Sequence, residues 1–458
     1  MKLKIIFILI FISSIFIANS VVFKFDKYEK STDNKSNHSL IKGDVHKFWV
    51  EADKIKKNFQ DDKPIYDFGG VFWNSYLPPK FIAFFYIVTG EDLYTDKLTL
   101  DNKRQVKSGN KKIYFIYLQI FFFFISLYLL YKCLNKKHSE IALITIIILL
   151  IEPTLNQYHY SFLSESIFFS LTIILLSQIL KNSNSKITAF NIGLLVGIMY
   201  LQRSIAIFYF LPILFYFIFE RKKLVFMFSY LSGLILILSF LGIHNFLRSD
   251  VFYVTPIQSK VDLYRYLIPN ISKEKNSDQS KKELKNFEKK FQTFKLKNEI
   301  DTNSEEDLIK YSKYVQKVSI NYILQNPSST IKVIFKKSLH SLVFNPFEIN
   351  TFYKYEYKPA NKKKYEYYKS DEHKKNVKIR VFYSSIIYLI SLMGFFNLLR
   401  NRKNYNLTIF LILSVLYFTF LGGWQGNPRY LAPNMIFLSI FFSYGILEIK
   451  KRFEFLRS

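Results

Sequence analysis

The stretch of residues 43–90, which follows the first apolar run, contains the residue types that a proton-transfer site needs. Gly43-Asp44 opens it, and Glu51 and Asp53 follow within ten residues. A carboxylate beside a hydroxyl can take the hydroxyl proton as a new bond forms. Residues 46–56 have helical spacing, with Phe48, Trp49 and Ala52 on one side. Asp44 would cap this helix, whose dipole would hold the carboxylate in one direction. Asp44 is therefore the leading candidate base, and a simple helix cap is the equally good alternative.

Glu51 and Asp53 are the reserve acids. In a helix, Glu51 lies about two turns from Asp44 on the same side, whereas Asp53 lies off that face. The stretch has enough carboxylates to hold a divalent cation but no convincing set of ligands. We therefore expect no metal site and no certain cofactor, and a requirement for a divalent metal stays open.

Four basic residues are candidates for binding a phosphate. Arg429 follows the glycine-rich residues 422–426 and leads the group, and Arg203 lies in a short turn between two apolar runs. Arg248 and Lys80 are weaker candidates. Arginine suits this task because its planar fork binds phosphate in two places and keeps its charge. For Arg203, an arginine that extends to the membrane interface is the alternative.

Glu165 and Tyr76 complete the candidate site. They are candidates for orienting a cation or the acceptor, which is the compound whose hydroxyl proton the base takes. Glu165 lies where an apolar run begins, so a carboxylate favoured by the helix dipole is the alternative. Tyr76 opens Tyr76-Leu77-Pro78-Pro79, a turn that leads into an apolar helix.

These residues lie between long apolar runs. Half of the 458 residues are hydrophobic and 22% are charged, with the charges in blocks between the runs, which is typical of a multi-spanning membrane protein. The first run lies within residues 1–23, and the later ones lie near 113–133, 140–156, 166–180, 187–201, 205–219, 224–246, 380–399, 406–423 and 431–448. We expect an all-α polytopic membrane protein with about ten transmembrane helices.

The positions of Lys and Arg predict the orientation of these helices. The basic short loops are 135–138, 181–186, 220–223, 400–403 and 450–452. The turns without Lys, with at most one Arg each, are 157–165, 202–204 and 424–430. Because short cytoplasmic loops carry an excess of Lys and Arg, both ends of the chain should be cytoplasmic, in the cytoplasmic membrane, with the two longest loops outside.

The predicted regions are a first transmembrane helix (1–23), an outer catalytic loop with short helices (24–112), a helix bundle (113–246), an outer helical segment (247–379) and C-terminal transmembrane helices (380–458). The first run is either a retained span, which we favour, or a cleaved signal peptide. Residues 273–310 predict a charged helical hairpin or a mobile segment.

Residues 311–344 predict amphipathic helices around a break at Asn326-Pro327. They either lie on the membrane surface, with Lys332, Lys336 and Lys337 toward lipid phosphates, or pack on the spans as an ordinary helical domain.

The net charge of +29 comes largely from lysines at the ends of apolar runs, so topology explains it and we expect no nucleic-acid partner. The sequence has no Walker or dinucleotide motif, which argues against ATP-driven transport and a nicotinamide enzyme. The single cysteine, Cys133, excludes an intrachain disulfide and a cysteine-built zinc site.

Five motifs in this order resemble the GT-C membrane glycosyltransferases, especially the branch of protein mannosyltransferases and aminoarabinose transferases (glycosyltransferase family 39). The motifs are Gly43-Asp44, Tyr76-Leu77-Pro78-Pro79, His244-Asn245-Phe246-Leu247-Arg248, Asn326-Pro327 and Arg429-Tyr430-Leu431-Ala432-Pro433. Glu165 is similar to an acidic residue in an outer turn of that family. In the third motif Asn precedes Arg, whereas the family has Arg first.

The resemblance implies that an acceptor on a lipid, glycan or protein attacks C1 of a sugar carried on polyprenyl phosphate, with inversion. It implies Asp44 as the base and the arginines as contacts of the departing phosphate, whose negative charge they stabilise. The expected partners are this donor, the acceptor and membrane lipids.

Three other classes of protein fit parts of the pattern. One is a polysaccharide polymerase or ligase that uses lipid-pyrophosphate-linked glycans. Another is a transporter, against which the near absence of charges inside the predicted spans argues. The third is a non-catalytic polytopic membrane protein on a GT-C-like scaffold, because fold alone does not prove function.

Overall fold

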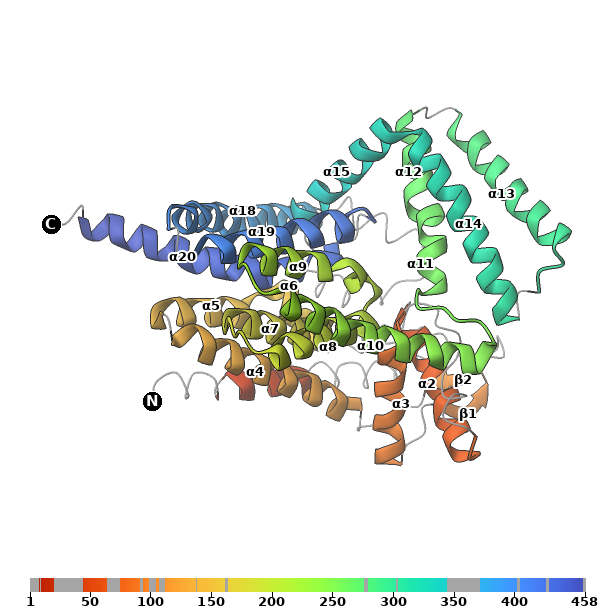
Figure 1. Cartoon of the computed structure of the whole chain (residues 1–458), viewed down its shortest axis with the longest axis horizontal. Helices are drawn as coiled ribbons and strands as arrows, with labels where there is room; N and C mark the ends of the chain where they lie inside the picture. Colours follow the sequence, from red (N-terminus) through yellow and green to blue (C-terminus); the bar gives the residue numbers. More distant parts are fainter. Residues whose placement is uncertain are drawn as a thin grey trace.

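The computed structural model describes residues 8, 10–19, 44–63, 75–90, 94–98, 104–106, 112–136, 138–160, 164–275, 279–301, 304–343, 371–401, 404–425 and 428–455. In this part of the chain, helices form an elongated bundle, and further helices cover one of its ends (Figure 1). A short antiparallel hairpin of β1 (Tyr94–Leu98) and β2 (Arg104–Val106) is the one sheet described. The predicted all-α class of polytopic membrane protein is confirmed.

Each of the ten predicted apolar runs contains a helix. The helices long and apolar enough to cross a membrane are α4 (Lys112–Asn135), α10 (Leu224–Ser249), α18 (Asp371–Arg400) and α19 with η7 (Tyr405–Tyr417 and Phe418–Gly422). The other runs form Ile10–Asn19, α5 (Ser139–Ile151), α7 (Glu165–Leu180), α8 (Lys186–Gln202), η4 with α9 (Ser204–Phe208 and Phe210–Phe219) and α20 (Asn434–Phe455). The short helices α6 (Pro153–Asn156), η3 (Gln157–Tyr160) and η8 (Pro428–Tyr430) lie in turns.

Glycines allow two pairs of these helices to approach closely. A Cβ atom at Gly193 of α8 would lie 1.9 Å from the carbonyl oxygen of Tyr230 in α10. One at Gly394 of α18 would lie 1.7 Å from the carbonyl oxygen of Phe441 in α20. Membrane helices associate through such backbone contact because lipid is as apolar as their side chains.

The first loop segment contains α2 (Asp44–Gln60) and α3 (Leu77–Thr89). Phe48, Ala52 and Ile55 of α2 are buried, so the predicted apolar face exists, and the helix is longer than the predicted 46–56. In Figure 1, α3 lies across the bundle axis, beside α2 and near the end of α10. Prolines in the first turn of α3 cost no hydrogen bond, because the first N–H groups of a helix have no partner within it.

The second loop segment contains α11 (Ile257–Asp262), η5 (Leu263–Leu267), α12 (Ile268–Lys275), α13 (Ser280–Lys297), α14 (Glu305–Gln325) and α15 (Pro327–Val343). The ring of Phe294 in α13 stacks on that of Tyr314 in α14, with centroids 3.9 Å apart. Of the two alternatives for residues 273–310, the helical one is confirmed for α13, but its partner helix α14 extends to Gln325, well beyond the predicted end at 310. The break at Asn326-Pro327 is confirmed too, because α14 ends at Gln325 and α15 begins at Pro327.

Candidate functional site

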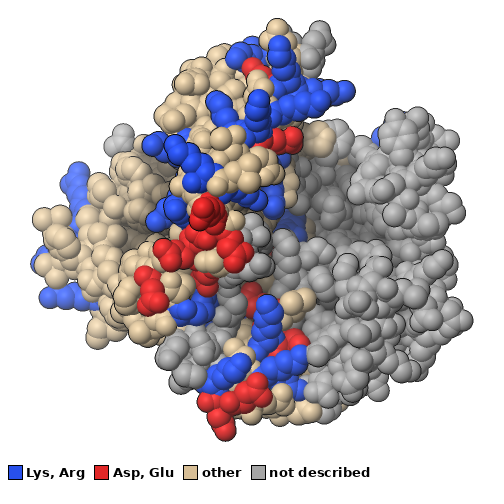
Figure 2. Space-filling model, turned by 90° about the vertical axis from the view of Figure 1, so that its right-hand side faces the viewer, with Lys and Arg blue, Asp and Glu red and all other residues tan. Residues whose placement is uncertain are grey.

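The two loop segments meet the bundle at its right-hand end in Figure 1, where α2, α3, the end of α10 and the start of α14 lie. This end is strongly charged: Figure 2 shows many Lys and Arg side chains in its upper part and a group of acidic side chains below them. Two clusters of interacting charged residues bring the candidate residues together. We call Glu165, Arg203 and Arg429 the bundle cluster, and Glu51, Lys80, Arg248 and Glu305 the loop cluster.

The bundle cluster holds two guanidinium groups on one carboxylate. Arg203 Nη1 and Arg429 Nε each lie 2.7 Å from Glu165 Oε1. The side chain of Glu165 is fully buried, that of Arg203 is 6% exposed and that of Arg429 is 18% exposed. A buried carboxylate needs such partners, because an unpaired ion is costly outside water. With both pairs formed, the cluster carries a net charge of +1.

Short turns position the bundle cluster. The helix α8 ends at Gln202, and Arg203 takes an extended backbone (φ −149°, ψ 124°) before η4 begins. Gln202 Nε2 donates a hydrogen bond to the carbonyl oxygen of Ser164, 3.0 Å away, next to Glu165 at the start of α7. The ring of Tyr430 lies 5.1 Å from the guanidinium of Arg203 and 5.3 Å from that of Arg429, within the range of cation–π attraction.

Arg248 is the centre of the loop cluster. Its Nη2 lies 2.6 Å from Glu305 Oε1 and also donates to the hydroxyl of Tyr253 at 2.8 Å. The Tyr253 hydroxyl in turn donates to Glu305. Asn245 contacts the same nitrogen through Oδ1 at 3.3 Å, and its Nδ2 donates to the carbonyl oxygen of Tyr253 at 2.7 Å. The guanidinium is thus fixed between α10 and the start of α14.

Glu51 and Lys80 give the loop cluster groups that titrate near neutral pH. Burial raises the pKa of the Glu51 carboxyl to about 7, against the opposing charges of Lys80 and Arg248. Burial lowers the pKa of Lys80 to about 8, against the attraction of Glu51. Perturbed pKa values of this kind are common at functional sites, because proton transfer requires a group that titrates near the working pH.

Tyr76 joins the two clusters. Its backbone N–H donates to the carbonyl oxygen of Leu201 at 2.9 Å, two residues before Arg203. Lys80 Nζ lies 3.6 Å from the centroid of its ring, and the ring meets His244 edge-on with centroids 5.3 Å apart. Burial raises the pKa of the Tyr76 hydroxyl. This predicted site residue therefore lies between the loop segment and the bundle.

The other two predicted acids have different positions. Asp44 is the first residue of α2, and its side chain lies outside the described part of the structure. It is seven residues before Glu51, which places both on one face of the helix. Asp53 forms an ion pair with Lys57 at 2.8 Å, one turn later on α2. This ion pair is local to the helix.

Sequence reasoning missed Glu305, Tyr253 and Asn245 as members of the site. Asn245 was part of a recognised motif, but it had no assigned role. Glu305 lies 57 residues after Arg248, so no local spacing links the two. The one available signal was the acidic start of α14, with three acidic residues in its first turn, which is also common at ordinary helix starts.

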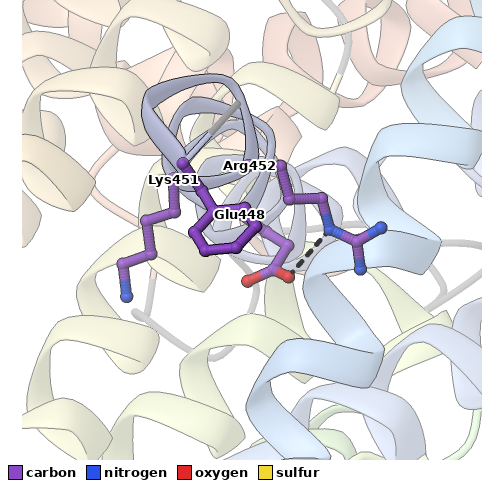
Figure 3. A pocket seen from close by; sticks show the side chains of 4 residues that line it. Glu448, Lys451 and Arg452 are labelled. Atoms are coloured by element: carbon purple, nitrogen blue, oxygen red, sulfur yellow. Dashed lines mark hydrogen bonds and ion pairs between the residues drawn. The ribbon is translucent and has the colours of Figure 1, made fainter. Parts of the chain in front are cut away.

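In the described ranges, no three His, Cys, Asp or Glu side chains lie together as they would around a metal ion. A shallow pocket lies on the C-terminal part of α20, lined by Glu448, Lys451, Arg452 and Phe455 (Figure 3). It contains an ion pair of 3.1 Å between Arg452 and Glu448, one helical turn apart. In Figure 1 the C-terminal part of α20 lies at the end of the bundle away from the two loop segments.

Comparison with known proteins supports the resemblance seen in the sequence. No curated protein matches the chain significantly. A model of the dolichyl-phosphate-mannose-protein mannosyltransferase family matches residues 108–244. The matched part begins just before α4 and ends within α10, and it contains Glu165 and Arg203. The matched family is the one that the sequence motifs resemble, over residues 108–244 and thus less than half of the chain, and the apolar helices show that the chain is a multi-pass membrane protein.

Proposed function

We propose that this protein transfers a sugar from a polyprenyl-phosphate carrier to an acceptor at the outer face of the cytoplasmic membrane, with inversion at C1. One observation supports this most. The four predicted phosphate-binding cations come from separate parts of the chain to one end of the bundle, and each has a carboxylate in its surroundings. Cations fixed before the reaction stabilise a departing phosphate without further reorganisation.

In this proposal the bundle cluster binds the phosphate. Arg429 is the more exposed of its two arginines, so we assign to it the direct contact with the phosphate oxygens. Arg203 is almost buried, so in this proposal it adds positive charge next to Arg429 without direct contact with the phosphate. Glu165 orients both arginines, which limits the entropy lost when the donor binds.

The loop cluster supplies the proton acceptor. Glu51 is the acid that the described contacts favour, because its pKa of about 7 suits a general base at neutral pH. Asp44 is the acid that the family resemblance favours, and it shares a helix face with Glu51. Lys80 and Arg248 then lie beside the base, where they stabilise its charged form and add positive charge for the departing phosphate.

Transfer by the purified full-length protein in lipid nanodiscs tests this function. The donors are polyprenyl-phosphate mannose and polyprenyl-phosphate aminoarabinose, and released polyprenyl phosphate is measured with a membrane extract as the source of acceptor. We expect release by the wild-type protein, and a loss of at least 100-fold for Arg429→Ala and for either Asp44→Asn or Glu51→Gln. Glu306→Gln is the matched control.

Three results would point elsewhere. Unchanged transfer by both Asp44→Asn and Glu51→Gln would remove both acids from the role of base. Consumption of a lipid-pyrophosphate oligosaccharide instead of these donors would favour the polymerase or ligase. Consumption of neither class of donor would favour a non-catalytic membrane protein.

A further inference from the structure

The helix α15 has one packed face and one apolar face without a described protein neighbour. On the packed face, Ser338 is buried and lies so close to Gly423 that a Cβ atom there would be 2.6 Å from its hydroxyl oxygen. On the other face, Ile331, Phe335 and Leu339 are 68%, 53% and 45% exposed. Their spacing of four residues places them in one stripe along the helix.

Lysines flank this stripe. Lys332 and Lys336 each follow a stripe residue by one position, and α15 contains no Asp or Glu. Lys336 also pairs with Glu274 of α12 at 3.4 Å, with its side chain still 77% exposed. Lys337 lies on the packed side, where burial lowers its pKa. An apolar stripe beside a basic row fits the boundary between lipid chains and phosphates.

The end of α15 reaches the level of a membrane span. The hydroxyl of Tyr388 in α18 donates to the carbonyl oxygen of Leu342 at 3.0 Å. Tyr388 lies seven residues inside the candidate span Val381–Arg400, which is about 10 Å from its start at 1.5 Å per residue. Leu389, next to Tyr388, is 63% exposed, as expected of a lipid-facing residue. Leu339 lies less than one helical turn before Leu342, so the stripe continues the apolar surface of the spans.

We propose that α15 is a membrane-surface helix. Its stripe of Ile331, Phe335 and Leu339 enters the leaflet on the side of the loop segments, and Lys332 faces the phosphates of the phospholipids there. This contact is independent of sugar transfer. It holds the second loop segment, which carries Glu305, at a fixed height above the bilayer.

Depth-dependent quenching in the full-length protein tests the proposal. A nitrobenzoxadiazole label is attached at Phe335→Cys, or separately at Leu339→Cys, in a Cys133→Ser background in nanodiscs of phosphatidylcholine and phosphatidylglycerol. We expect emission at shorter wavelength and at least threefold stronger quenching by doxyl-chain lipids than for the control Lys317→Cys, which is exposed on α14. A label at Lys332→Cys should be quenched more by head-group-labelled lipid than by chain-labelled lipid. Thermal unfolding like that of the Cys133→Ser parent shows that each variant is folded.

Two outcomes overturn the proposal. Labels at 335 and 339 that are quenched no more than the label at 317 would show that the stripe faces water. Emission at shorter wavelength without quenching by lipid would show that protein, such as a second copy of the chain, covers the stripe.

Discussion

The two clusters differ in how their charge responds to pH. In the bundle cluster, two guanidiniums, which do not lose their protons in proteins, share one buried carboxylate. In the loop cluster, a carboxyl with a pKa of about 7 interacts electrostatically with an amine with a pKa of about 8. The first is a fixed positive site and the second is a titratable one. This difference is the reason for our proposal that the bundle cluster binds the phosphate and the loop cluster takes the proton.

The largest expected effect follows removal of the carboxylate that both arginines share. Glu165→Ala leaves two buried guanidiniums close together without a counter-charge. Breaking a buried ion pair by removing one partner costs about 3–5 kcal/mol, so the unfolding temperature in detergent should fall well below that of the wild type. Glu140→Ala is the control, because Glu140 is 58% exposed in its pair with Lys450. Equal unfolding temperatures for the two variants would contradict the bundle cluster as described.

Replacement of Arg429, the leading phosphate contact, should have the second-largest effect. Arg429→Ala should lower kcat/KM for the donor by about 100- to 1000-fold, as for loss of one transition-state donor. Arg429→Lys should restore only part of this, because lysine lacks the planar fork. The measurement is the initial rate of donor consumption at several donor concentrations. Arg452→Ala, at the other end of the bundle, is the control and should leave the rate unchanged. A full recovery of the rate in Arg429→Lys would show that charge alone is required.

The pH dependence should separate the clusters further. A base must be ionised, so kcat/KM should rise with pH through about 7, and it should fall above about 8 as Lys80 loses its proton. The two groups interact, so these limbs belong to the pair. Glu51→Gln should remove the acidic limb along with most of the rate, and Arg429→Ala should keep both limbs at a lower rate. A profile that is flat from pH 6 to pH 9 in the wild type would contradict a titratable loop cluster.

The same raised pKa also predicts a trend in stability. Between the ordinary carboxyl pKa near 4.5 and about 7, the folded protein binds more protons at Glu51 than the unfolded chain does. Stability must therefore fall as pH rises through this window. In Glu51→Gln this contribution should be absent, which thermal unfolding at pH 5 and pH 7.5 can measure. A fall of the same size in the variant would assign the trend to other groups.

The smallest expected effect concerns Glu305, which orients Arg248 without touching the reacting atoms. Glu305→Gln should raise KM for the donor about tenfold and change kcat little, and Glu305→Asp should recover part of the loss. Its exposed neighbour gives the matched control Glu306→Gln. Loss of kcat at constant KM would show that Glu305 has a direct chemical role instead.

The sequence predicted the features that depend on local residue patterns, such as helices, helix breaks and buried helix faces. Apolar runs located the helices of the bundle, Asn326-Pro327 located a break, and the spacing of Phe48 and Ala52 predicted the buried face of α2. Lysine and arginine patterns predicted the topology, which stays a prediction. Hydrophobic periodicity carries this information because it reports which face of each helix is buried.

Contacts between residues that are far apart in the chain could not be predicted from the sequence. Glu165 was a candidate for orienting a cation and also for a simple helix start; the structure places it at the start of α7 and against two arginines. The bond between Tyr76 and Leu201 and the pair of Arg248 with Glu305 join segments far apart in the chain. The pKa of Glu51 depends on its burial by other elements, and this burial cannot be inferred from the spacing of residues within α2.

Binding of the product, polyprenyl phosphate, tests the division between the clusters most directly. Its affinity for the full-length protein is measured in nanodiscs from pH 6 to pH 9 for the wild type, Arg429→Ala and Glu51→Gln. We expect Arg429→Ala to bind at least tenfold more weakly at every pH, and Glu51→Gln to bind within threefold of the wild type while its transfer is lost. Equal loss of affinity in both variants would contradict separate sites for the phosphate and the proton.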